Sequence, residues 1–234
     1  METLYRKTEK PVLVLELIFK LLFITYGFLQ ASSITFGNKI ISVLWPTIAL
    51  GGLLILYRFL FFKKYKDSTG IYILIFFAVS YAISSIFMRQ YGVSENFRYL
   101  VFLTLQFGML YAYKNGDCVD KVKKHFQICM QYVCLVTAVL ALTSFVLMFS
   151  GYNKAFVSLD NPEAPPYYIG FANGRLYGAY WDPNIGALTA VVVILLSVYF
   201  IIKHKHWVLK TLHALNLTLQ VCYVAFSDSR TGRV

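Results

Sequence analysis

Charged side chains are scarce in this sequence. Only 14% of its 234 residues are Asp, Glu, Lys or Arg, whereas a typical soluble domain carries about a quarter. The chain is 58% hydrophobic, and several apolar runs reach the ~20 residues that a helix needs to cross a bilayer. A lone segment in lipid must satisfy its own backbone hydrogen bonds, which favours helices. The composition therefore excludes a soluble domain and predicts an all-α polytopic membrane protein in contact with the bilayer.

Metal-binding and disulfide-forming residues are few as well. The chain has four cysteines: Cys118, Cys129, Cys134 and Cys222. Their spacing matches neither a metal site nor a disulfide framework, and packing is the better interpretation. The pair His204 and His206 has no carboxylate or third ligand nearby in the sequence. We therefore expect no metal and no cofactor.

Acidic residues are half as frequent as basic ones, 11 against 22, which leaves a formal net charge of +11. Such an excess can indicate nucleic-acid binding, but in a membrane protein it follows from the positive-inside rule, so no nucleic-acid partner is expected. In the loops between the apolar runs, about twice as many Lys and Arg residues lie on the side of the amino terminus as on the other. This bias predicts a cytoplasmic amino terminus.

Seven apolar stretches are predicted to be transmembrane helices: 11–31, 39–62, 71–88, 98–113, 127–150, 184–203 and 207–226. They would form a single transmembrane helical domain over 1–234, with one sizeable external loop, 151–183, before the sixth helix. The first stretch carries charges and lacks a convincing cleavage site, so we interpret it as an uncleaved membrane helix and not as a signal peptide.

Two opposite charges lie within the first stretch. Glu16 and Lys20 are four residues apart, so they share a helix face as a possible ion pair. A charge near the centre of a membrane helix costs about 2.5–3.5 kcal/mol, so the pair would face other helices or water. Alternatively, the span begins later and Lys20 extends to the inner interface. Both interpretations remain open at this point.

The external loop is rich in aromatic residues, among them Tyr177, Tyr180 and Trp181, which argues against disorder. These rings could anchor the loop at the level of the lipid headgroups. They could also form a surface that binds sugar rings and hydroxyl groups. Pro162, Pro165 and Pro166 favour a turn-rich path over a helix in this loop.

The loop runs into the sixth helix through Arg175-Leu-Tyr-Gly-Ala-Tyr-Trp-Asp-Pro-Asn-Ile-Gly186. Asp182 is suited to cap this helix, with Pro183 at its first position; alternatively, its carboxylate accepts a proton at the outer membrane face. The planar guanidinium of Arg175 is suited to phosphate oxygens. Ser227-Asp-Ser-Arg230 and Arg233 follow the last apolar stretch and are predicted on the same outer side.

These segments resemble the superfamily of O-antigen ligases and of O-antigen and capsular polysaccharide polymerases. The similarity lies in Gly178-Ala-Tyr-Trp-Asp182-Pro183-Asn184-Ile-Gly-Ala, followed one span later by Ser227-Asp-Ser229-Arg230. Arg175 and Gly186 also match a pattern of arginine, ten residues and glycine in polymerase loops. The resemblance covers roughly residues 90–234.

The resemblance implies a glycosyltransferase-type enzyme of the bacterial inner membrane. It would transfer an oligosaccharide from a polyprenyl diphosphate on the outer face, in O-antigen, capsule or exopolysaccharide synthesis. Other polysaccharide-assembly membrane proteins would be its partners. The implied catalytic residues are Arg175, Arg230 and Asp182. The implied substrate-binding residues are Tyr177, Tyr180, Trp181, Asn184, Ser227, Ser229 and Arg233.

Members of this superfamily continue past Ser-x-Ser-Arg with another large external loop and further spans. We therefore expect this chain to be incomplete at its carboxyl end and inactive alone. A multi-span transporter, or a membrane subunit without catalysis, is the alternative interpretation. A transporter would favour paired charges at the membrane midplane and internal repeats.

Overall fold

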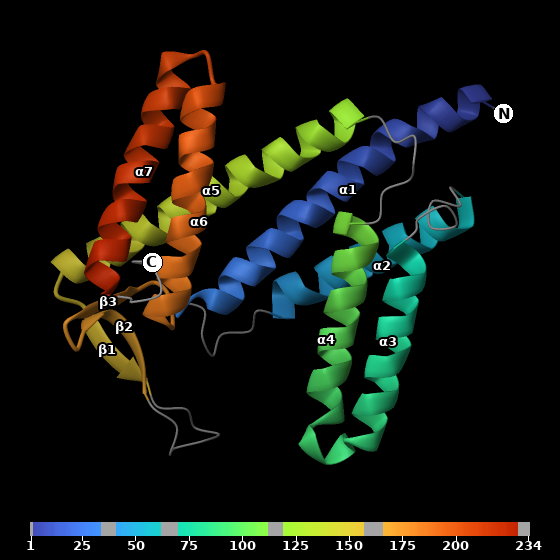
Figure 1. The fold of residues 1–234 in the computed structure, drawn as a ribbon, viewed down its shortest axis with the longest axis horizontal. Helices are drawn as coiled ribbons and strands as arrows, with labels where there is room; N and C mark the ends of the chain where they lie inside the picture. Colours follow the sequence, from blue (N-terminus) through green and yellow to red (C-terminus); the bar gives the residue numbers. More distant parts are fainter. Residues whose placement is uncertain (1, 34–40, 62–69, 112–118, 157–165, 229–234) are drawn as a thin grey trace. The chain divides into compact units, whose positions relative to one another are not determined.

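The computed structural model describes residues 2–33, 41–61, 70–111, 119–156 and 166–228. In these parts the chain forms seven α-helices and a small sheet (Figure 1). The helices are α1 (Glu2–Ala31), α2 (Ile41–Phe61), α3 (Gly70–Phe87), α4 (Val93–Gln106), α5 (Val119–Phe149), α6 (Pro183–Lys203) and α7 (Trp207–Ser227). A 3-10 turn, η1 (Arg89–Tyr91), precedes α4, and a π-helical segment, η2 (Phe107–Tyr111), continues it. Each predicted stretch holds one helix, so hydropathy identified the helices correctly.

Four of the described helices contain a segment long and apolar enough to cross a bilayer: Pro11–Ala31, Val43–Leu60, Val122–Phe149 and Pro183–Lys203. The apolar part of α3, Tyr72–Phe87, is shorter. Large apolar side chains project outward from the helices; Phe87 and Ile202, for example, are 80% and 78% exposed. Surfaces of this kind are stable against lipid and unstable against water. The chain is therefore a helical membrane protein that contacts the bilayer.

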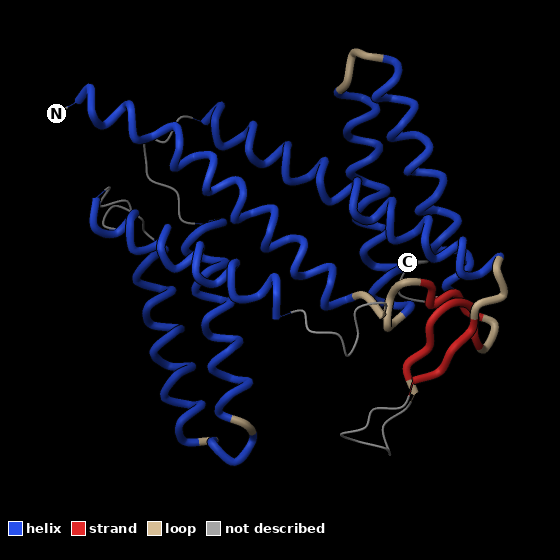
Figure 2. Tube along the Cα trace, turned by 180° about the vertical axis from the view of Figure 1, so that it is seen from behind, coloured by secondary structure: helices blue, strands red, loops and turns tan. Residues whose placement is uncertain are grey.

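The loop before α6 contains an antiparallel sheet that the all-α prediction omitted (Figure 2). Its strands are β1 (Asn153–Phe156), β2 (Tyr167–Ala172) and β3 (Arg175–Gly178), in that spatial order. Asn173 and Gly174, with φ values of 54° and 73°, join β2 to β3. Asn-Gly adopts positive φ easily and is the commonest signal for a two-residue hairpin turn. The sequence therefore carried the signal, but the strands are too short to stand out by periodicity.

The chain divides into two compact units, each with its own set of internal contacts. Unit 1 comprises Met1–Phe23 and Ile41–Phe126. Unit 2 comprises Ile24–Ile40 and Gln127–Val234. Unit 2 holds the sheet, α6, α7 and most of α5. The segments singled out by the sequence motifs therefore all belong to unit 2.

Buried charge distinguishes the interior of unit 1. The carboxylate of Glu16 accepts a hydrogen bond from Arg58 Nε at 2.7 Å, and Arg58 Nη1 donates to the carbonyl of Gly108 at 2.8 Å. Glu16 and Lys20 are only 5% and 4% exposed, as the interpretation with both charges facing other helices predicts. The sequence predicted Lys20 as a possible partner of Glu16, whereas this ion pair joins Glu16 to Arg58, 42 positions further along the chain. The apolar core of the same unit is formed by Phe19, Leu54, Leu105 and Met109.

In unit 2, the core joins the sheet to the helices. Its main cluster consists of Ala141, Phe145, Leu176, Tyr180, Ala190 and Tyr223, drawn from α5, β3, α6, α7 and the turn before α6. A second cluster contains Cys134, Val193 and Phe200, so Cys134 is a packing residue as predicted. Helices α6 and α7 lie side by side along their length (Figures 1 and 2). The hairpin strand β3 is therefore part of the same core as the helices and is not a loosely attached loop.

The buried ion pair of unit 1 gives the first prediction. Glu16→Leu leaves Arg58 buried without its carboxylate, which should lower the free energy of unfolding by about 3–5 kcal/mol. The double variant Glu16→Leu/Arg58→Leu removes both charges and should recover most of the loss. Thermal unfolding in detergent, followed by circular dichroism, measures both variants. Equal destabilisation by the single and the double change would contradict the pairing.

Candidate functional site

Arg175 joins the two sequence segments that resembled a polymerase. It begins β3, and its Nε donates to the backbone carbonyl of Ser227 at 3.0 Å, at the end of α7. Its Nη2 donates to Asn184 Oδ1 at 3.0 Å, in the first turn of α6. One guanidinium thus links a strand, a helix start and a helix end. The helices of unit 2 bring together residues that lie 52 positions apart in the sequence.

The start of α6 is capped as predicted. Asp182 has an extended backbone, and its carboxylate accepts a hydrogen bond from the Asn184 N–H at 2.8 Å. Pro183 occupies the first helical turn, where its missing N–H leaves no intrahelical bond unmade. Asn184 therefore bonds to Asp182 through its backbone and to Arg175 through its side chain. The cap explains Asp182 structurally, and the proton-acceptor role remains a prediction.

Two tyrosines, Tyr180 and Tyr223, pack against the first turn of α6. Tyr180 is 1% exposed, and its ring meets that of Tyr223 edge-on, with 5.5 Å between centroids. Burial raises the pKa of the Tyr180 phenol, so its hydroxyl stays protonated. Because so little of Tyr180 is exposed, the side chain has no face left for a sugar and serves as a core residue. Its predicted place among the substrate-binding aromatics has no support in this geometry.

Gly186, the glycine of the arginine-to-glycine pattern, has a clear packing role. A Cβ atom at this position would overlap the hydroxyl group of Tyr223 and the ring of Tyr180. Only glycine therefore lets the first turn of α6 approach both tyrosines this closely. Arg175 itself bonds to Asn184 in the same first turn of α6.

Four aromatic residues of the sheet and of the turn before α6 are half-buried. Tyr168 and Tyr177 are neighbours on β2 and β3, with 5.2 Å between ring centroids. Tyr167 and Trp181 form an edge-on pair at 6.1 Å. Of the predicted aromatic contacts, Tyr177 and Trp181 are therefore half-buried and retain faces for a ligand. Their arrangement is compatible both with an interfacial belt and with a sugar-binding surface.

Ser144 of α5 holds the end of the hairpin. Its Oγ accepts a hydrogen bond from the backbone N–H of Ala179 at 2.8 Å. The contact is so close that a Cβ atom on Gly178 would overlap the Ser144 side chain. Ser144 also donates to its own helix at Leu140, at 2.7 Å. Sequence analysis missed this residue, because a serine within an apolar stretch usually bonds only within its helix.

The end of α1 provides a second anchor within unit 2. The Ser33 N–H and the Ser32 hydroxyl both donate to the Ala179 carbonyl, at 2.8 and 3.0 Å. The Trp181 N–H donates to the Ala31 carbonyl at 3.3 Å. Both serines are buried. The backbone between β3 and α6 is therefore held from two sides, which leaves Arg175 on a rigid support.

The segment after α7 is described only as far as Asp228. The Ser227 side chain is buried and donates to the Val224 carbonyl at 2.8 Å, so its backbone carbonyl, and not its hydroxyl, reaches Arg175. Asp228 follows in a left-handed conformation with φ 47° and is exposed. The predicted site residues Ser229, Arg230 and Arg233 lie outside the described residues.

The arrangement can bind an anion with exposed oxygens. Arg175 is half-buried, and within the described chain its Nη1 makes no hydrogen bond, so N–H groups remain for a ligand. The amino end of α6 lies beside it, and the carboxylate of Asp182 partly offsets the positive end of the helix dipole there. The described residues include no group of three His, Cys, Asp or Glu side chains placed to hold a metal ion.

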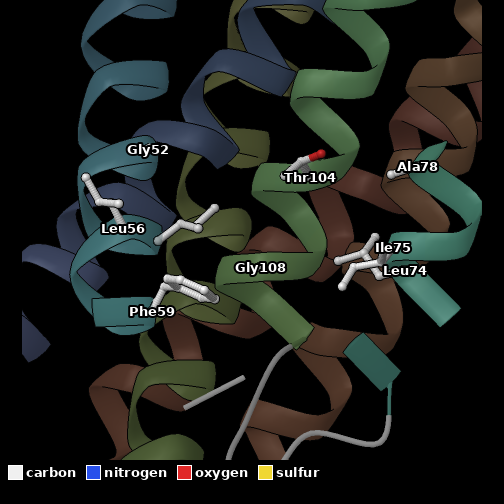
Figure 3. Close-up of a pocket in the computed structure, with 9 residues that line it drawn as sticks. Gly52, Leu56, Phe59, Leu74, Ile75, Ala78, Thr104 and Gly108 are labelled. Atoms are coloured by element: carbon white, nitrogen blue, oxygen red, sulfur yellow. The ribbon is translucent and has the colours of Figure 1, made fainter. Parts of the chain in front are cut away.

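A cavity of about 520 Å³ lies apart from these residues, in unit 1 (Figure 3). Apolar side chains of α2 and α3, such as Leu56, Phe59 and Ile75, line it. Among its lining residues Thr104 has the only side-chain hydroxyl, and that group donates to the Leu100 carbonyl in its own helix. The lining of this cavity is therefore almost entirely apolar.

Comparison of the chain with protein-family models, with curated proteins and with solved structures gave no match. Any function therefore has to be argued from the geometry around Arg175 and from the motifs that lie there. Those motifs meet at one place in unit 2, which makes this place the candidate functional site.

Asp182 is interpreted either as a helix cap only or also as a proton acceptor, and the two interpretations predict different effects of substitution on stability and activity. Asp182→Ala removes the cap and should lower the free energy of unfolding by about 1 kcal/mol. Asp182→Asn keeps an oxygen acceptor for the Asn184 N–H and should leave the thermal midpoint almost unchanged. If the carboxylate also accepts a proton, Asp182→Asn loses activity while it retains stability. Thermal unfolding and an activity assay on the same preparation distinguish the roles, and an unstable Asp182→Asn would contradict the cap.

Proposed function

We propose that this chain is part of a membrane glycan polymerase or ligase. It would transfer an oligosaccharide from a polyprenyl diphosphate on the outer face of a bacterial inner membrane, in O-antigen, capsule or exopolysaccharide synthesis. In this proposal the seven helices all span the membrane and the amino terminus is cytoplasmic. The sheet and the Arg175 site then face outward, where lipid-linked sugars are available.

The observation that supports the proposal is the position of Arg175. Its guanidinium is held by the Ser227 carbonyl and the Asn184 side chain, at the amino end of α6. Glycan transfer from a polyprenyl diphosphate releases a diphosphate, so negative charge grows on that group as the glycosidic bond breaks. A fixed cation beside a helix amino end stabilises such charge without reorganising during the reaction. The geometry therefore suits the leaving group of this reaction.

The proposal assigns further roles around the leaving group. Asp182 and Asn184 shape the pocket and orient Arg175, while Tyr177 and Trp181 present aromatic faces to the sugars next to the diphosphate. From the resemblance of the sequence, the proposal also assigns diphosphate binding to Arg230, Arg233 and Ser229, which lie outside the described residues. No cofactor is needed, because the lipid diphosphate itself carries the energy of the transfer.

The proposal predicts the phenotype of Arg175→Ala. Cells that carry the full-length gene with this change should produce no long-chain glycan, because the diphosphate loses its bound cation. Arg175→Lys keeps the charge but not the planar fork, and should reduce long-chain glycan at least tenfold. Gel electrophoresis of extracted glycan measures the chain length, and immunoblotting of membranes checks that the protein is inserted. Arg89→Ala, which removes an exposed arginine of η1, is the matched control.

Normal glycan length in inserted Arg175→Ala would remove Arg175 from the site and sink the proposal. Loss of glycan in the Arg89→Ala control would show that the assay responds to any lost arginine. Because both changes remove one guanidinium, the comparison isolates the position of the charge.

One observation favours a transporter as the second candidate. The Glu16–Arg58 ion pair lies buried between helices of unit 1, and intramembrane charges often mark the path of an ion or substrate. A transporter would lose its flux in Glu16→Gln, provided that the variant folds, and would retain it in Arg175→Ala. A glycan polymerase would lose its activity in Arg175→Ala and retain it in Glu16→Gln. The same two variants therefore decide between the candidates.

A further inference from the structure

Tyr223 is the most deeply buried tyrosine near the site, and no sequence motif included it. None of its side chain is exposed. Its hydroxyl donates to the Tyr177 carbonyl at 3.1 Å, and its ring packs edge-on against Tyr180. The same hydroxyl touches Gly186 so closely that a Cβ there would overlap it. Tyr223 therefore connects α7 with β3, with the turn before α6 and with α6 itself.

Helix α7 holds β3 at two points on one face. Tyr223 and Ser227 are four residues apart, so they lie one turn apart on the same side of the helix. The Tyr223 hydroxyl binds the Tyr177 carbonyl, and the Ser227 carbonyl binds Arg175 Nε. Arg175 and Tyr177 are two residues apart on the strand, about 7 Å along it. The strand thus lies along the helix face, and its angle to α7 is set by both bonds together.

Nearer its amino end, α7 is hydrogen-bonded to α5 and α6, and these bonds fix its position along the helix axis. Asn216, on the same helix face, donates to the Cys134 carbonyl of α5 and to Ser197 Oγ of α6, both at 3.3 Å. Gln220 donates to the Asn216 side chain at 3.0 Å. In a lipid environment no water replaces such bonds, so they resist sliding of the helix. These bonds therefore fix the position of Tyr223 along α5 and α6.

We propose that Tyr223 is a positioning residue that orients Arg175 toward the anion site at the amino end of α6. This inference rests on the proposed function, in which Arg175 binds a polyprenyl diphosphate. Tyr223 is fully buried and does not touch the substrate. It acts by holding Tyr177, and hence β3, at the angle where Arg175 reaches Asn184 and Ser227 together.

Tyr223→Phe tests this role by removing a single oxygen atom. The probe is farnesyl diphosphate, titrated into the purified full-length protein in detergent by isothermal calorimetry. One neutral hydrogen bond corresponds to roughly a 2–10-fold change in an equilibrium constant. We expect the Kd to rise within that range, while the binding stoichiometry stays constant. A purely structural defect would lower the stoichiometry instead, because fewer molecules would be folded.

Tyr132→Phe is the matched control. The Tyr132 hydroxyl is hydrogen-bonded to Thr25 Oγ1 at 2.6 Å, between α5 and α1 in unit 2, and makes no contact with Arg175. Its removal also deletes one interhelical hydroxyl bond, so it should cost similar stability without changing the Kd. An equal rise of the Kd in Tyr132→Phe and Tyr223→Phe would overturn the assignment.

A double variant links the effect to Arg175. Lysine at position 175 cannot make both guanidinium bonds, so Tyr223→Phe should change the Kd less than twofold when added to Arg175→Lys. Full additivity of the two changes, or a wild-type Kd in Tyr223→Phe, overturns the positioning role. If the unaltered protein does not bind farnesyl diphosphate, or if Arg175→Lys binds it equally well, the proposed function fails and Tyr223 loses its role with it.

Discussion

The hydrogen bond from Arg175 to the Ser227 carbonyl is the contact on which the site depends. The last carbonyls of an α-helix have no partner within the helix and carry the negative end of its dipole. Arg175 satisfies one of them with a charged donor and thereby fastens β3 to the end of α7. Its second bond, to Asn184, fastens the same strand to the start of α6. A single side chain thus links the end of α7 and the start of α6, which the shared core of unit 2 already holds close together.

Buried polar side chains impose the second constraint, because polar groups that are removed from water must find partners within the protein. Asn216 and Gln220 bond to each other and to neighbouring helices, and Glu16 is paired with Arg58. These bonds restrict how helices can slide or rotate. In unit 2 this restriction supports the rigid geometry that an electrostatic site requires, since a cation helps a developing charge only when it is already in place.

The small sheet also restricts movement around the site. Its last strand carries Arg175, and its end is anchored by Ser144, Ser32 and Ser33. A loop without these bonds would have to order itself when a ligand binds, and the binding energy would be reduced by the entropy of that ordering. The hairpin therefore allows a segment between helices to present a fixed cation together with partly exposed aromatic rings. That combination suits a ligand in which a diphosphate is attached to a sugar.

Hydropathy alone located the seven helices of the described chain, four of which contain an apolar segment of membrane length with few other stable conformations. The cap at Asp182 was also predictable from the sequence, since capping depends on residues adjacent in the chain. The sequence did not predict the hydrogen-bond partners of Arg175, Glu16 and Tyr223, because these contacts join residues 42 to 52 positions apart. A sequence shows which side chains need a partner. Only the packing of the helices decides which group supplies it, and for Arg175 that group was a backbone carbonyl, which every residue possesses and no motif can mark.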